Sequence, residues 1–118
     1  MTIQERFETL KKSGAEVPRP LELFAELDEK SALAHLDSKA ATFAAGAVPS
    51  KYKYLMALAA AVALDSPSCA MNNTKLARKS GASKAEIMET IAVAKFSKSA
   101  TVLSTAAQAL EWLVSQAD

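Results

Sequence analysis

Hydrophobic side chains recur at helical spacing from the beginning of the chain. Ile3, Phe7 and Leu10 fall on one face of a helix over residues 3–12. Gly14 follows at the position where a left-handed residue commonly ends a helix. The pattern therefore predicts a short amphipathic helix at the N-terminus.

A longer helical pattern covers residues 21–45. The prolines within residues 17–20 cannot continue the first helix, because proline lacks the amide donor and restricts the residue before it. We expect the new helix to begin near Pro20 and to run either without interruption or with a break around residues 28–31. Gly46 and then Pro49 end it.

Two further helices are predicted in the middle of the chain. Residues 50–64 begin amphipathic and become apolar on all sides, which is typical of a helix buried on most of its surface, in the core or between subunits. The next helix is expected to start at Pro67, with Ser66 as its N-cap, and to stop at Gly81.

A capping-box sequence marks the start of the following helix. Ser83 and Glu86 have the Ser-x-x-Glu spacing in which each side chain bonds to the other residue's amide. Apolar residues continue on one face after this box, namely Ile87, Ile91 and Ala94. This pattern is the strongest local prediction of secondary structure in the chain.

A separate final helix is expected after residues 96–99. It carries two neighbouring apolar rows, formed by Leu103, Ala107, Leu110 and Val114 and by Val102, Ala106, Ala109 and Leu113. Together the two rows form an apolar stripe that is wider than a single contact surface needs. We therefore expect this helix to be buried against both its own domain and a partner subunit.

No segment has the alternating pattern of a strand. Alanine occurs in clusters, and the 118 residues include only three glycines and four prolines. The fold class is therefore predicted to be all-α. The length suits one domain with one core over residues 1–118, with N-terminal helices in 1–45 and the remaining helices in 46–118.

Charge and cysteine content narrow the classes of function. A net charge of +1 does not favour a nucleic-acid or membrane-surface protein. The single cysteine excludes an intrachain disulfide and fits a reducing compartment. No secretory signal is visible, and the longest apolar run, residues 54–64, is well short of the ~20 residues that span a bilayer. We expect a cytoplasmic protein.

Cys69 is the main candidate for chemistry. If Ser66 is the N-cap, Cys69 lies in the first turn, where free amides and the helix dipole favour an anion such as a thiolate. The alternative is that it packs as a small buried hydrophobic residue. His35 is a single histidine without clustered ligands, so we expect no metal site, no cofactor and no role for His35.

The segment from about Gly46 to Leu113 resembles a known family. It contains Val48-Pro-Ser-Lys-Tyr-Lys-Tyr-Leu-Met-Ala-Leu58, an alanine-rich helix, the Cys69 turn, a Gly-Ala-Ser-x-x-Glu-Ile phrase at residues 81–87 and a long alanine-rich helix. These features are similar to the carboxymuconolactone decarboxylase and alkylhydroperoxidase D family. The resemblance implies an alkylhydroperoxidase D-like helical fold, a homo-oligomer (commonly a trimer or hexamer) and, if the chain is active, a peroxiredoxin-like antioxidant oxidoreductase.

Redox members of that family carry a glutamate and, twelve residues later, Cys-x-x-Cys-x-x-x-His. With Cys69 as the second cysteine, the resemblance puts Ser66 at the first cysteine, Asn73 at the histidine and Tyr54 at the glutamate. Serine cannot close a disulfide, asparagine cannot exchange a proton near neutral pH, and tyrosine has a pKa near ~10. The dithiol mechanism is therefore lost.

Three interpretations follow from this degenerate motif. In the first, Cys69 is oxidised by a peroxide to a sulfenic acid that an external thiol resolves, with Ser66 and Tyr54 orienting the peroxide. In the second, Ser66 caps the helix, Asn73 makes a local hydrogen bond and Tyr54 packs. The chain is then a non-catalytic oligomer with a small-ligand cavity near these residues. Decarboxylation is not favoured, because the matching positions offer no evident base.

The third interpretation is DNA binding by a helix-turn-helix. Ala77, Gly81 and Ile87 have the required spacing, and basic residues lie nearby. However, the helix that would read the bases presents Glu86 and Glu89. We therefore expect no nucleic-acid partner.

Overall fold

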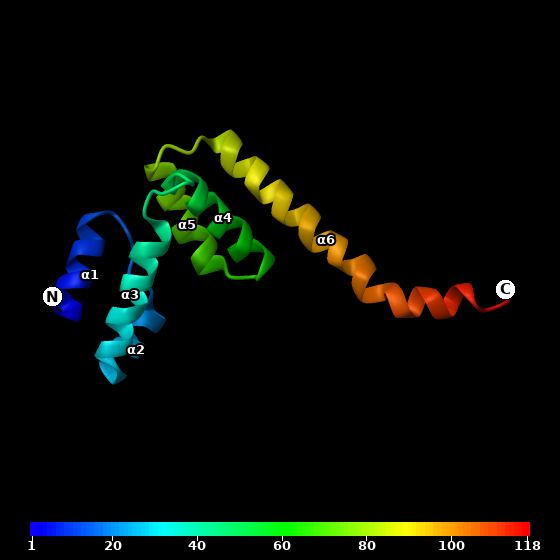
Figure 1. Cartoon of the computed structure of the whole chain (residues 1–118), viewed down its shortest axis with the longest axis horizontal. Coiled ribbons are helices and arrows are strands. Elements are labelled where there is room, and N and C mark those ends of the chain that lie inside the picture. The colour runs from blue at the N-terminus through cyan, green and yellow to red at the C-terminus, as the bar shows by residue number, and fades with distance from the viewer.

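The computed structural model describes residues 1–118 as an all-helical chain, as predicted (Figure 1). Its six helices are α1 (Ile3–Lys12), α2 (Arg19–Leu27), α3 (Glu29–Phe43), α4 (Ser50–Ala63), α5 (Pro67–Lys79) and α6 (Lys84–Val114). None of these helices combines the length and the hydropathy needed to cross a bilayer.

The helical pattern of residues 21–45 is interrupted, as one of the two alternatives predicted. Asp28 leaves the helical conformation with φ −150° and ψ 83°, so α2 ends there and α3 begins. Its carboxylate accepts a hydrogen bond of 2.9 Å from the amide of Ser31, which caps α3. An aspartate can therefore both end one helix and start the next.

The prediction that a separate final helix begins after residues 96–99 is wrong. α6 runs without a break from Lys84 to Val114. The segment contains no glycine or proline. Around residues 96–101, where the break was expected, two hydroxyl groups bond within the helix: Ser99 Oγ donates to the carbonyl of Phe96 at 3.1 Å, and Thr101 Oγ1 donates to that of Lys98 at 2.6 Å. Because these polar side chains are satisfied locally, they do not end the helix.

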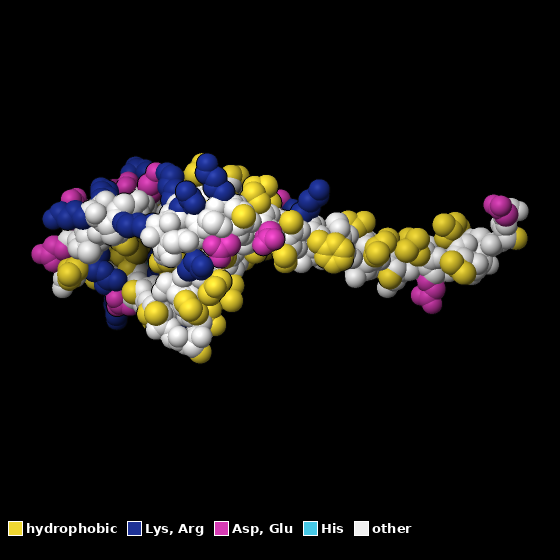
Figure 2. Space-filling view, turned by 90° about the horizontal axis from the view of Figure 1, so that it is seen from above, with side chains coloured by type: hydrophobic (Ala, Val, Ile, Leu, Met, Phe, Trp, Pro, Cys, Tyr) yellow, Lys and Arg dark blue, Asp and Glu magenta, His cyan; other side chains and the backbone are white.

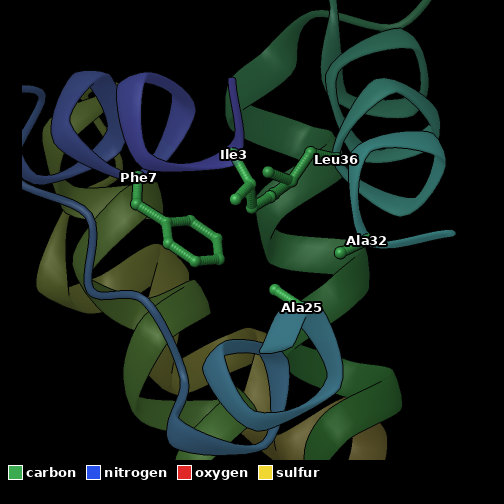
Figure 3. Close-up of a cluster of buried hydrophobic side chains, with 5 residues drawn as sticks. All are labelled: Ile3, Phe7, Ala25, Ala32 and Leu36. Carbon is green, nitrogen blue, oxygen red and sulfur yellow. The ribbon is translucent and has the colours of Figure 1, made fainter. Parts of the chain in front are cut away.

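Buried side chains form two clusters rather than the single core expected from the length. The first joins the three N-terminal helices and contains Ile3, Phe7, Ala25, Ala32 and Leu36 (Figure 3). The second joins α4, α5, the turn after α5 and the start of α6, and contains Leu55, Leu58, Ala77, Ala82 and Ile87. α3 belongs to the first cluster and α5 to the second, so a site between these two helices lies where the clusters meet.

α4 is less buried within the chain than its apolar sequence predicted. One face is buried, with Leu55, Leu58 and Ala61 below a tenth exposed, whereas Tyr52 and Met56 on the other side are 45% and 58% exposed. The expectation of burial on most of the surface is therefore not met inside a single chain.

The second half of α6 extends away from the rest of the molecule (Figure 1). The side chain of Lys98 pairs with Asp65, at the end of α4, and beyond it every residue except the half-buried Ala106 is exposed. The chain consequently measures 68 × 36 × 25 Å. The prediction that this segment packs against its own domain is wrong.

Candidate functional site

Cys69 lines a groove of about 480 Å³ between the N-terminal helices and α5. Its apolar wall consists of side chains from α1, the α1–α2 segment, α2 and α3, namely Leu10, Pro18, Pro20, Leu21, Phe24 and Leu36. Its polar lining consists of Glu16, His35, Lys39, Ser68, Cys69 and Asn72. The groove is therefore apolar along one side and carries a thiol, an imidazole and an ammonium group.

The Cys69 thiol is exposed rather than buried. The alternative that Cys69 serves as a small core residue is therefore wrong. α5 begins at Pro67 with Ser66 in the N-cap position, as predicted, which makes Cys69 the third residue of the helix. The sulfur is thus close to the positive end of α5 and open to a reactant.

Lys39 and His35 reach the same groove from α3, one helical turn apart. Burial lowers the pKa of the Lys39 ammonium, and its charge interaction with Cys69 acts in the opposite direction. Lys39 is half-buried, and none of the five ion pairs of the chain includes it. A cation without an acidic partner therefore lies beside the thiol.

Asn73 and Cys69 are brought together, as the motif implied. Both line a hollow of about 310 Å³ that adjoins the groove and also contains His35, Lys39 and Asn72. The side-chain carboxamide of Asn73 makes no hydrogen bond within the chain, so the predicted local bond is absent. Two carboxamides are thus free to bind a small polar molecule beside the sulfur.

Ser66 and Tyr54 are not brought to the thiol. The Ser66 hydroxyl makes no capping bond, contrary to expectation, and Ser66 lines neither hollow that contains Cys69. The Tyr54 ring stacks on Phe43, with centroids 4.7 Å apart and planes 9° from parallel. Tyr54 therefore packs, as the second interpretation predicted, and it joins α3 to α4.

Sequence reasoning missed the placement of Lys39 and His35 beside Cys69. The available signal was their spacing of four residues on a helix that lacks a strongly apolar face. That spacing is too common to single out a site without knowledge of which helix faces α3.

Two further features concern metal binding and the helix-turn-helix spacing. No three His, Cys, Asp or Glu side chains converge in a way that could hold a metal ion. The corner between α5 and α6 buries Ala77 and Ile87 in the second cluster, and Gly81 turns the chain with φ +99°. The helix-turn-helix spacing therefore coincides with a packing corner.

A comparison with models of protein families shows to which family the chain belongs. The model of the carboxymuconolactone decarboxylase family matches residues 29–112. The chain belongs to this family. Comparisons with curated proteins and with solved structures gave no match.

The match begins earlier than the resemblance that started near Gly46. It includes all of α3, so His35 and Lys39 lie within the carboxymuconolactone decarboxylase family region rather than before it. The groove residues on α3 and α5 are therefore part of the family match, whereas those from α1, the α1–α2 segment and α2 precede it.

Proposed function

We propose that the chain is a one-cysteine antioxidant peroxidase in which Cys69 is the nucleophile. The observation that carries this proposal is the placement of the exposed Cys69 thiol beside the half-buried Lys39 ammonium, at the start of α5. A thiolate is the reactive form of cysteine, and nearby positive charge stabilises it.

The reaction consumes one peroxide and two small thiols. The Cys69 thiolate attacks one peroxide oxygen, the O–O bond breaks, and a sulfenic acid and an alkoxide or hydroxide form. Lys39 or His35 supplies the proton to the leaving oxygen. A small thiol then attacks the sulfenic sulfur, which releases water and forms a mixed disulfide, and a second thiol releases Cys69 and a small disulfide. A reducing compartment such as the cytoplasm supplies these thiols.

The residues around Cys69 fit this one-cysteine cycle better than a dithiol cycle. Ser66, at the first position of the family motif, cannot form a disulfide and does not line the groove. Asn72 and Asn73 place carboxamide donors beside the sulfur, where they suit a peroxide oxygen. Lys39 and His35 take the place of the missing proton-relay partners.

Stopped-flow oxidation by hydrogen peroxide and by an organic hydroperoxide tests the proposal, with the sulfenic acid trapped and identified by mass spectrometry. We expect Cys69 to react at least tenfold faster than free cysteine at the same pH. Lys39→Met should slow the reaction severalfold, whereas Lys30→Met, on an exposed part of α3, should leave it unchanged. A rate no faster than that of free cysteine, with no effect of Lys39→Met, would overturn the proposal.

A second candidate function is binding of a small amphipathic carboxylate without catalysis. The unpaired Lys39 in a groove that also has an apolar wall favours it, because a half-buried ammonium without an acidic partner is suited to an anion. A groove of about 480 Å³ also falls within the usual range of small-molecule sites.

Calorimetry with decanoate, and with decanol as the uncharged match, tests this second function. We expect decanoate to bind at least tenfold more tightly than decanol, and Lys39→Met to remove the difference. Equal affinities for the two compounds would contradict it. Cys69→Ser should leave decanoate binding intact, which separates this function from the peroxidase.

A further inference from the structure

A second hollow, of about 380 Å³, lies between α1, α3 and the start of α4. α3 runs between the other two helices (Figure 1). The hollow adjoins the Cys69 groove but contains neither Cys69 nor His35. We name it the Arg6 hollow. The largest side chains that line it are those of Arg6, Leu10, Leu36, Lys39, Phe43 and Tyr54.

The Arg6 hollow carries two cationic groups and no acidic one. Arg6 and Lys39 are both partly buried, and no aspartate or glutamate lines the hollow. The Cys69 groove, by contrast, includes Glu16. A ligand with two negative charges is therefore matched better by the hollow than by the groove. Lys and Arg side chains also gather on the compact part of the molecule, which holds the hollow, and few lie on the extended helix (Figure 2).

Three side chains of the hollow keep donor groups that the fold does not use. Arg6 Nη1 binds Oδ1 of Asp37 at 2.6 Å, and the other guanidinium nitrogens make no hydrogen bond within the chain. The Lys39 ammonium and the Tyr54 hydroxyl make none either. The Tyr54 ring is held by its stack on Phe43. A guanidinium, an ammonium and a hydroxyl group are suited to the oxygens of a phosphate.

We propose that the Arg6 hollow binds a small phosphate monoester, with the phosphate on its three polar side chains and the organic part against its apolar lining. Such a phosphate carries close to two negative charges at neutral pH and three acceptor oxygens, which match two cations and a hydroxyl donor. Inorganic phosphate would leave the apolar lining without a contact. This inference goes beyond the peroxidase proposal, and it holds whether or not Cys69 reacts with peroxide.

Calorimetry with phenyl phosphate tests this proposal on the full chain. Three matched compounds each lack one feature: inorganic phosphate has no apolar part, benzoate has a single negative charge, and benzyl alcohol has no charge. We expect phenyl phosphate to bind at least about tenfold more tightly than each of them. Equal affinity for phenyl phosphate and any of the three would overturn the proposal, as would no binding of phenyl phosphate at millimolar concentration.

Two variants test the position of the phosphate. Arg6→Met should weaken the binding of phenyl phosphate about tenfold, and Tyr54→Phe, which retains the stacked ring, should weaken it severalfold. Arg19→Met is the matched control, because it removes another arginine that pairs with a carboxylate but lies outside the hollow. His35→Gln changes the groove alone and should also leave binding unchanged. Binding that His35→Gln weakens and Arg6→Met does not would overturn the proposal.

Asp37→Asn separates contact with the ligand from a structural role of Arg6. It breaks the same ion pair as Arg6→Met but keeps the guanidinium, and the Asp37 side chain is 69% exposed. We expect phenyl phosphate to bind severalfold more tightly to this variant, because the carboxylate no longer competes for Arg6. Equal weakening by Asp37→Asn and Arg6→Met would overturn the proposal, because the ion pair and not the ligand contact would then account for the loss.

Discussion

Lys51 and Glu86 join α4 to the first turn of α6. The Nζ of Lys51 lies 3.0 Å from Oε2 of Glu86, while the other carboxylate oxygen, Oε1, accepts a hydrogen bond of 3.0 Å from the amide of Ser83. A single carboxylate therefore closes the capping box of α6 and also fixes the direction in which that helix leaves the second cluster.

The Glu86 carboxylate should make stability depend on pH in the acid range. The hydrogen bond from the Ser83 amide and the contact with Lys51 lower its pKa below the ordinary value of 4.5. Its contribution to the free energy of unfolding is therefore fully present above about pH 4.5 and is lost as the pH falls through the lower, folded-state pKa.

Glu86→Gln should retain the capping bond and lose the ion pair. We expect it to be less stable than the wild type at pH 7, with a difference that shrinks below pH 4.5, as measured by urea unfolding at a series of pH values. Glu89→Gln changes a neighbouring exposed carboxylate that has no ion pair and serves as the control. A difference that is constant from pH 7 to pH 3 would contradict this explanation.

The Lys39 ammonium should lower the stability of the folded chain, whereas the Glu86 carboxylate raises it. Burial lowers its pKa, so the folded chain carries a penalty that is complete below the folded-state pKa and disappears as the pH rises to 10.5. Lys39→Met should therefore raise the urea midpoint at pH 7, by an amount that decreases toward pH 10.5. Lys30→Met should show no such gain. A destabilised Lys39→Met would indicate that the ammonium has a partner in the fold.

Gly81 should not tolerate a side chain. Its φ of +99° is a conformation that residues with a Cβ adopt at a cost of ~1–2 kcal/mol, although no neighbouring atom obstructs the added methyl group. Gly81→Ala should lower the free energy of unfolding by about that amount. Gly46→Ala is the control. Gly46 has no positive φ, and the atom nearest to an added Cβ is 4.0 Å away, so this substitution should be neutral or slightly stabilising.

Leu58 should be the most sensitive aliphatic position of the second cluster. It is 1% exposed, the largest side chain of the protein that is fully buried. Leu58→Ala should cost about 2–5 kcal/mol in thermal or urea unfolding. Leu27→Ala removes the same atoms from a side chain that is 90% exposed, so it should change stability by less than ~0.5 kcal/mol. Equal effects at the two positions would contradict the burial of Leu58.

Local chemistry made much of the fold predictable from the sequence. The capping box of Ser83 and Glu86, the proline at the start of α5 and the glycine turns at Gly14 and Gly81 all depend on residues within a few positions of one another. Such features can therefore be predicted from a short stretch of sequence. The break at Asp28 was predicted only as an alternative, because an aspartate in a helical pattern is compatible with either outcome.

The site could be predicted only in part, because its two sides are far apart in the sequence. The position of Cys69 at the start of α5 followed from Ser66 and Pro67. The presence of His35 and Lys39 beside it depends on how α3 packs against α5, which no short-range pattern specifies. Hydrophobic periodicity also cannot distinguish a helix face covered by its own chain from one covered by another, which explains the wrong prediction for the C-terminal half of α6.

The two buried clusters have a consequence for the Cys69 groove. His35 and Lys39 come from a helix held by the first cluster, and Cys69 and Asn73 from one held by the second. The site thus exists only while the two halves of the chain are docked. Because Cys69 is already exposed, it is the charge environment of the single thiol, with Lys39 beside it, that reports on this docking and makes Cys69 a built-in probe of partial unfolding.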